Sequence, residues 1–185
     1  MTNREQTTKI ILTGLMMAMV VVATMMIAIP TPFTSGYIHL GDAMIFLSVL
    51  ILGWRYGAVA AGAGSALADI LLGYMIWAPW TLVIKGAMGV VMGLFLLRAM
   101  KKPGRYLLGV PVYQVIGMVL AGCFMAVGYC IAGWLIYGNF IAAVLGIPLN
   151  ILQFSIGMVL ATILAAALYK TPAKRFFTYR PMIKE

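Results

Sequence analysis

The sequence predicts an all-α integral membrane protein, a single domain over residues 1–185 with six transmembrane helices, and three observations predict it. Apolar residues make up 64% of the 185-residue chain and charged residues only 9%, against roughly 25% charged residues in an ordinary soluble domain. The apolar residues gather in runs near the length of about 20 residues that a helix needs to cross a bilayer. The Lys and Arg residues lie mostly in short clusters between these runs. A water-soluble fold of this composition would have too little polar surface.

The expected helices follow from the apolar runs and their interruptions. The first run covers residues 9–29 and stops at Pro30-Thr31-Pro32, because proline blocks helical continuation. Five more apolar segments follow it, so it reads as an uncleaved first helix rather than a signal peptide. The other helices are expected over residues 41–53, 54–73, 79–97, 106–133 and 147–169.

Two stretches leave room for a different arrangement. Residues 41–53 are short for a bilayer span, so the alternative is five spans in which residues 41–73 form one broken hairpin. Residues 134–146 are apolar, but Gly138, Asn139 and Gly146 interrupt them. We expect this stretch to be a loop over the outer surface.

The distribution of Lys and Arg residues predicts which side of the membrane each loop faces. With six spans and both termini in the cytoplasm, twelve of the thirteen Lys and Arg residues fall in cytoplasmic segments and the three outer loops hold none. These twelve are Arg4, Lys9, Arg55, Arg98, Lys101, Lys102, Arg105, Lys170, Lys174, Arg175, Arg180 and Lys184. Such a bias is the positive-inside pattern of membrane proteins, and it explains the net charge of +9 better than nucleic-acid binding does.

Two ionisable residues lie inside expected helices, Asp69 and the thirteenth cation, Lys85. A charge in a bilayer costs roughly 2.5–3.5 kcal/mol on insertion scales, so it is normally paired or functional. Both residues fall in the outer half of neighbouring helices, and we expect them to form an ion pair. The pair either clamps the two helices together or belongs to a ligand site.

Other polar and aromatic residues are expected at the same depth, near the outer face. His39 and Asp42 begin the second helix, and Asn150 and Gln153 share one face of the sixth because they are three residues apart. Tyr37, Tyr74 and Trp77 lie near this level, either as ring-stacking walls or as interfacial anchors. The pattern indicates a pocket open to the outside. It contains no metal-ligand spacing and implies neither a cofactor nor a catalytic residue.

Small residues and a missing motif point to a partner. Gly14 and Ala18 share one face of the first helix, where small residues allow close helix contacts, either within the chain or with another subunit. The chain contains no GxxxxGK[ST] motif, the signature of a P-loop ATP site. A pocket without its own energy source suggests a separate energising complex.

Several motifs resemble a known family. Residues 36–43 (GYIHLGDA) and 62–69 (GAGSALAD), with Gly73-Tyr74, Ala78-Pro79 and Ile84-Lys85-Gly86, resemble the substrate-binding (S) components of energy-coupling factor transporters. The resemblance is to the riboflavin-type family, nearest its subunits for hydroxymethylpyrimidine or pyridoxine. It covers the first four helices well and the last two only in general character.

The resemblance implies a bacterial cell-membrane subunit that binds a vitamin from outside and carries no ATPase. Its partners would be a transmembrane coupling (T) subunit and two ATP-binding cassette ATPases. It implies that the Thr34–Gly41 loop is a lid, that Lys85 and the Asn150/Gln153 face line the pocket, and that Gly14 and Ala18 form the docking face. The family often has Ala at both docking positions, whereas the first is Gly here.

The expected cargo is therefore pyridoxine or hydroxymethylpyrimidine, with riboflavin as the alternative. Two further readings come from other classes of protein. One is a small intramembrane enzyme that uses Asp69 or His39 as acid or base, and the other is a structural or assembly membrane protein.

Overall fold

The computed structural model describes residues 3–31, 36–99, 106–107 and 110–179. Within these residues it contains five helices long and apolar enough to cross a membrane. They are α1 (Asn3–Met26), α2 (Gly41–Leu71), α3 (Ala78–Ala99), α4 (Val112–Tyr137) and α5 (Phe140–Tyr169). The all-helical membrane architecture predicted from composition is confirmed, with five long elements in place of six separate ones.

The difference in helix number lies in α2, which is broken at Gly53. This residue has φ 82° and ψ −180°, a conformation that is essentially restricted to glycine. The chain reverses there, and a Cβ on Gly57 would lie 2.7 Å from Val49 Cα, so the two arms of α2 pack closely against each other. The break falls at the boundary expected between the second and third spans.

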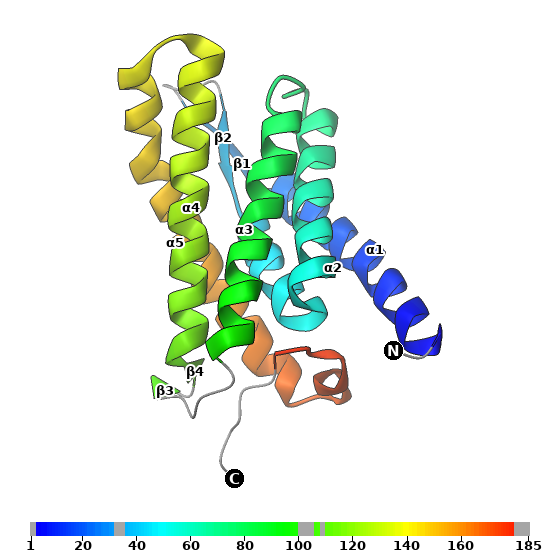
Figure 1. The fold of residues 1–185 in the computed structure, drawn as a ribbon. Helices are drawn as coiled ribbons and strands as arrows, with labels where there is room; N and C mark the ends of the chain where they lie inside the picture. The colour runs from blue at the N-terminus through cyan, green and yellow to red at the C-terminus, as the bar shows by residue number, and fades with distance from the viewer. Residues whose placement is uncertain (1–2, 32–35, 100–105, 108–109, 180–185) are drawn as a thin grey trace.

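The helices pack in a bundle in which α2 lies between α1 and α3, and α4 lies between α3 and α5. α5 also contacts α2 (Figure 1), which closes the bundle. The second arm of α2 and α3 approach closely because small residues face each other. A Cβ on Gly62 would lie 2.6 Å from the Leu82 carbonyl oxygen.

The short strands were not predicted from the sequence. α1 ends at Met26, earlier than expected, and is followed by β1 (Ala28–Pro30), which pairs antiparallel with β2 (Tyr37–His39). In the view of Figure 1 this hairpin is seen between α4 and α3. A second pair, β3 (Tyr106–Leu107) and β4 (Val110–Pro111), precedes α4 at the end of the bundle near the chain termini. Residues 34 and 35 of the expected lid lie outside the described residues.

The expected loop over residues 134–146 is wrong. α4 continues to Tyr137 and ends at Gly138, whose left-handed conformation terminates the helix. Asn139 then caps α5, because its side-chain oxygen accepts a hydrogen bond from the Ala142 N–H at 3.0 Å. Gly138 and Asn139 thus form a tight helix–helix turn, and the apolar residues around them are helical.

The segment after α5 forms hydrogen bonds with the chain at the break in α2. After η1 (Pro172–Phe176), the Thr178 N–H donates to the carbonyl oxygens of Leu50 and Ile51 at 3.1 and 3.0 Å. The Tyr179 hydroxyl donates to the Gly93 carbonyl oxygen at 2.7 Å. A helix end leaves carbonyls without partners inside the helix, and this segment supplies donors to those of the first arm of α2.

Candidate functional site

A partly open cavity lies between the β hairpin and the helices α2 to α5. Its volume is about 60 Å³. Its wall comes from Thr31, Gly36, Tyr37, Ile38, His39, Asp69, Trp77, Thr81, Tyr129, Ala143, Gly146, Leu149, Asn150 and Gln153. A mixed aromatic and polar cavity of this kind is the usual form of a small-molecule site.

Lys85 forms a buried ion pair with Asp42, beside the cavity. Both side chains are 0% exposed, and the ammonium also contacts the Met125 sulfur at 2.8 Å. The other Asp42 oxygen accepts a hydrogen bond from Gln153 Nε2 at 2.9 Å. The expected pairing of Lys85 with Asp69 is therefore wrong, because the Lys85 ammonium forms its ion pair with Asp42 at the start of α2.

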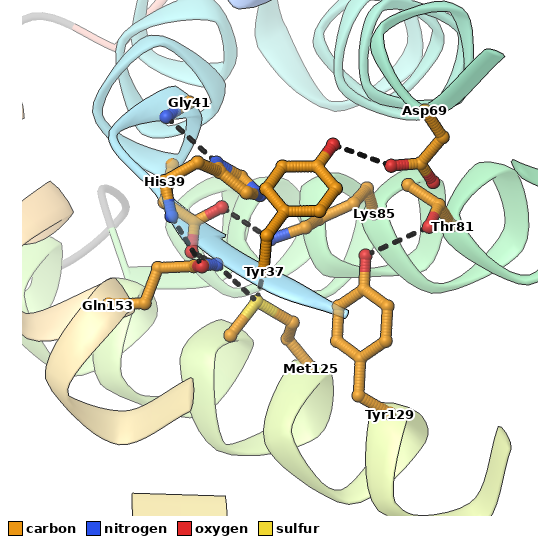
Figure 2. A network of polar contacts seen from close by, with 10 residues as sticks. Tyr37, His39, Gly41, Asp69, Thr81, Lys85, Met125, Tyr129 and Gln153 are labelled. Carbon is orange, nitrogen blue, oxygen red and sulfur yellow. Dashed lines mark hydrogen bonds and ion pairs between the residues drawn. The ribbon is translucent and has the colours of Figure 1, made fainter. Parts of the chain in front are cut away.

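Gln153 connects this pair to the β hairpin. Its Oε1 accepts a hydrogen bond from the His39 backbone N–H at 3.0 Å, while its Nε2 donates to Asp42 (Figure 2). The Gln153 side chain on α5 thus links β2 to α2 by hydrogen bonds. A single amide that satisfies groups on two elements makes the buried charge pair part of a continuous polar network.

His39 is neutral in this setting. Its Nδ1 accepts a hydrogen bond from the Gly41 N–H at 3.0 Å, so the ring proton is on Nε2. Burial, with the nearby Lys85 ammonium, lowers the pKa of His39 to about 3, although the Asp42 carboxylate acts in the opposite direction. The imidazole therefore lines the cavity as an uncharged group at physiological pH.

Asp69 occupies a different part of the wall. Its Oδ1 accepts a hydrogen bond from the Tyr37 hydroxyl at 2.6 Å. Burial and the adjacent carboxylate raise the pKa of Tyr37, so the phenol remains a donor. Asp69 Oδ2 makes no close hydrogen bond among the described residues. The Thr81 hydroxyl lies beside the carboxylate as a weak donor to it and accepts from the Tyr129 hydroxyl at 3.2 Å (Figure 2).

Aromatic rings form the rest of the wall. The ring of Tyr37 packs on Tyr74 with centroids 4.6 Å apart, and Trp77 contacts Tyr129 edge-on at 5.9 Å. Trp77 is only 6% exposed, which is too buried for an interfacial anchor. The position of Trp77 supports a wall for a flat ligand.

The structure brings together most of the residues expected at the site. Six line the cavity: Tyr37, His39, Asp69, Trp77, Asn150 and Gln153. Asp42, Tyr74 and Lys85 are not part of its wall and lie one layer behind it. Asn150 Nδ2 donates to the Gly146 carbonyl oxygen at 3.1 Å.

Three polar residues of the wall, Thr31, Thr81 and Tyr129, were not among the predicted site residues. Thr81 lies four residues before Lys85, which places both on one face of α3, and Tyr129 lies four residues after Met125 on α4. Helical spacing from Lys85 could have identified Thr81. Tyr129 carried no signal, because an isolated Tyr in an apolar run is ordinary. Among the described residues no group of three or more His, Cys, Asp or Glu side chains is placed to hold a metal ion.

The two expected docking residues lie away from the cavity on the outer face of α1. Gly14 and Ala18 are both exposed, and a Cβ on Gly14 would meet no atom within 4 Å. The face is therefore open within the described part of the chain.

The fold and the cavity define a class of protein: a helical membrane protein that encloses a small polar and aromatic site. The chain matches the family model described as the S component of the energy-coupling factor-type riboflavin transporter over residues 4–170. It belongs to that family, and it is therefore an integral membrane, substrate-binding subunit of a vitamin transporter. Such subunits are not enzymes, and the ATPase belongs to their partner subunits.

Individual relatives agree with this assignment. The chain is 29% identical over 164 residues to the thiamine precursor transporter HmpT of Lactococcus lactis, an alignment that covers 88% of this chain and 89% of the relative. It is 43% identical over 119 residues to an uncharacterised protein of Pyrococcus woesei, covering 64% of this chain and 74% of that one.

A solved structure shows the same fold. The crystal structure of the S component for biotin from an energy-coupling factor-type ABC transporter matches with a TM-score of 0.73. The match covers 96% of this chain and 99% of that chain at 18% identity. At this identity the likeness concerns the fold.

Proposed function

We propose that the cavity binds hydroxymethylpyrimidine, a small heteroaromatic precursor, for uptake by an energy-coupling factor importer, with pyridoxine as the second candidate. The observation that carries the proposal is the enclosed wall of Tyr37, Trp77 and Tyr129 around the polar groups of His39 and Asp69. Flat rings that bear a few polar substituents suit such walls. The similarity to a thiamine precursor transporter over most of the chain supports the same class of cargo.

The size of the cavity supports a single ring over riboflavin. The volume of the cavity is about 60 Å³. This space suits a monocyclic ligand, whereas riboflavin has three fused rings and a polyol chain. Riboflavin would require the wall to open considerably.

The site has two layers in this proposal. Tyr37, His39, Asp69, Trp77, Asn150 and Gln153 contact the ligand, with Thr81 and Tyr129 beside them. Asp42 and Lys85 hold Gln153 and the helices in place, and Tyr74 supports the ring of Tyr37.

The orientation and docking assignments are also part of the proposal. Both described ends of the chain lie at the end of the bundle opposite the α4–α5 turn (Figure 1), and the positive-inside pattern places that end in the cytoplasm. The cavity then opens toward the exterior. The open face of Gly14 and Ala18 on α1 would meet the transmembrane coupling subunit, which two ATPases would drive in a bacterial membrane.

Calorimetric titration of the purified subunit with hydroxymethylpyrimidine, pyridoxine and riboflavin tests the proposal. We expect saturable binding of hydroxymethylpyrimidine with one site per chain and a submicromolar Kd, and weaker binding of the larger riboflavin. Tight binding of riboflavin without binding of either monocyclic ligand would contradict the assignment.

A further inference from the structure

Two buried polar atoms on residues of the cavity wall lack a close hydrogen bond among the described residues. They are Trp77 Nε1, a donor, and Asp69 Oδ2, an acceptor. The two side chains are 6% and 3% exposed, so bulk water does not satisfy these atoms. Because buried polar groups are almost always paired in folded proteins, these two atoms mark the places where a bound molecule completes the site.

The charge of the wall specifies this molecule further. A carboxylate accepts hydrogen bonds only, and within the described ranges no Lys or Arg forms an ion pair with Asp69. Lys85, the nearest candidate along the chain, is held by Asp42. The Tyr37 hydroxyl satisfies one Asp69 oxygen at 2.6 Å. The Thr81 hydroxyl lies beside the other oxygen as a weak donor to the carboxylate (Figure 2), and a carboxylate oxygen can accept a further hydrogen bond from a ligand. The ligand must therefore bring an N–H or O–H donor to Asp69 and an acceptor to Trp77.

We propose that Asp69 and Trp77 recognise the amino-substituted edge of an aminopyrimidine. This inference rests on the proposed function and specifies its ligand class. In a 4-aminopyrimidine the exocyclic amino group, a donor, is adjacent to a ring nitrogen, an acceptor. The amino group donates to Asp69 Oδ2, and the ring nitrogen accepts from the Trp77 indole N–H. The rings of Tyr37 and Tyr129 enclose the flat faces.

The same pair of residues disfavours close analogues. A 4-oxopyrimidine carries a carbonyl next to a ring N–H, so in the same orientation it turns an acceptor toward Asp69 and a donor toward Trp77. Turning the ring over restores the hydrogen bonds only by exchanging the places of the 2-methyl and 5-hydroxymethyl groups in the cavity. Pyridoxine has a single ring nitrogen with no adjacent amino group, and it offers only part of the pattern. A site built around a hydrogen-bonded group rejects an analogue that lacks it far more strongly than an apolar pocket rejects a change of size.

The first test compares two ligands on the unaltered protein. Calorimetry measures the Kd of 4-amino-5-hydroxymethyl-2-methylpyrimidine and of its 4-oxo analogue. We expect the amino compound to bind at least roughly a hundredfold more tightly. Equal affinities would overturn the inference, because they would mean that water alone satisfies the two atoms. Binding of pyridoxine or riboflavin without the amino compound would overturn the inference and leave the vitamin-binding function standing. Binding of none of these ligands would overturn both.

The second test exchanges the recognition groups. Asp69→Asn places an amide donor where only an acceptor stood, so the preference for the amino compound over the oxo compound should shrink at least about tenfold. A folded variant with an unchanged preference would overturn the inference.

Trp77→Phe removes the indole N–H and should weaken binding of the amino compound about tenfold. Trp80→Phe is the matched control, since Trp80 is 36% exposed and outside the cavity wall. If Asp69→Asn does not fold, equal affinities of Trp77→Phe and Trp80→Phe overturn the inference.

Discussion

The buried ammonium of Lys85 shows how a single residue depends on its surroundings. It is 0% exposed and paired with Asp42 at the start of α2, and Met125 and Gln153 complete the group. Removing one member of a buried ion pair leaves the other charge uncompensated, which typically costs about 3–5 kcal/mol. Lys85 therefore contributes to the site by positioning the wall rather than by lining it.

Lys85→Met should lower the thermal unfolding temperature in detergent, because Asp42 then remains buried without a cation. The double variant Asp42→Asn/Lys85→Met removes both charges and should recover much of the loss, which a double-mutant cycle measures. Lys9→Met is the control, since Lys9 lies in α1 outside the network. An unfolding temperature for Lys85→Met equal to that of Lys9→Met would contradict the account.

Sequence reasoning at this scale identified the polar residues but not their pairing. Intramembrane charge singled out Asp69 and Lys85, and depth alone suggested that they pair. The hairpin of β1 and β2 instead places Tyr37 against Asp69, while the arm of α2 that begins at Gly41 places Asp42 against Lys85. A choice between two carboxylates at similar depth depends on helix rotation and on the hairpin. Neither can be read from the apolar pattern.

At the scale of an element, α2 depends on Gly53. Its φ of 82° and ψ of −180° belong to a region that costs other residues of order 1–3 kcal/mol. A Cβ there would also lie 3.2 Å from Thr178 Cγ2, within the segment that fastens the break. The reversal of the chain that brings Asp42 under the cavity therefore requires glycine.

Gly53→Ala should lower the free energy of unfolding by roughly 1–3 kcal/mol, as measured by thermal unfolding in detergent. The matched control is Gly14→Ala, an exposed position within α1 with no atom near its added Cβ, where alanine should be neutral or slightly stabilising. Equal unfolding temperatures for the two variants would show that the break does not depend on glycine.

The sequence predicted the helices far better than the connections between them. Long apolar runs and proline breaks indicated α1, α3 and the cores of α4 and α5. The interruptions at Gly138 and Asn139 suggest a loop in the sequence, whereas in the structure Gly138 ends α4 and Asn139 caps α5. The hairpin of β1 and β2 has three residues in each strand, too few for alternation to reveal.

At the scale of the whole molecule, the proposed function assigns ligand binding and coupling to separate surfaces. The cavity lies under the β hairpin, and its wall includes Gly146 on α5. The open face of Gly14 lies on α1, outside the wall. The composition predicted the membrane class, and the match to a family model over residues 4–170 shows the transporter family. The central claim is that the cavity binds the ligand and the exposed face of α1 contacts the coupling subunit. Substitutions of Gly146 in the cavity wall and of Gly14 on α1 test it.

The most direct test compares Gly146→Leu with Gly14→Leu, the same change at two helical positions. For each folded variant, calorimetry with hydroxymethylpyrimidine measures binding by the isolated subunit, and uptake of the labelled compound measures transport by the complete complex. Gly146→Leu fills the cavity and should abolish both. Gly14→Leu should leave binding within about twofold of the unaltered protein and abolish uptake. Undiminished binding by folded Gly146→Leu would contradict the placement of the ligand in this cavity, and loss of binding in Gly14→Leu would contradict the separation of the two faces.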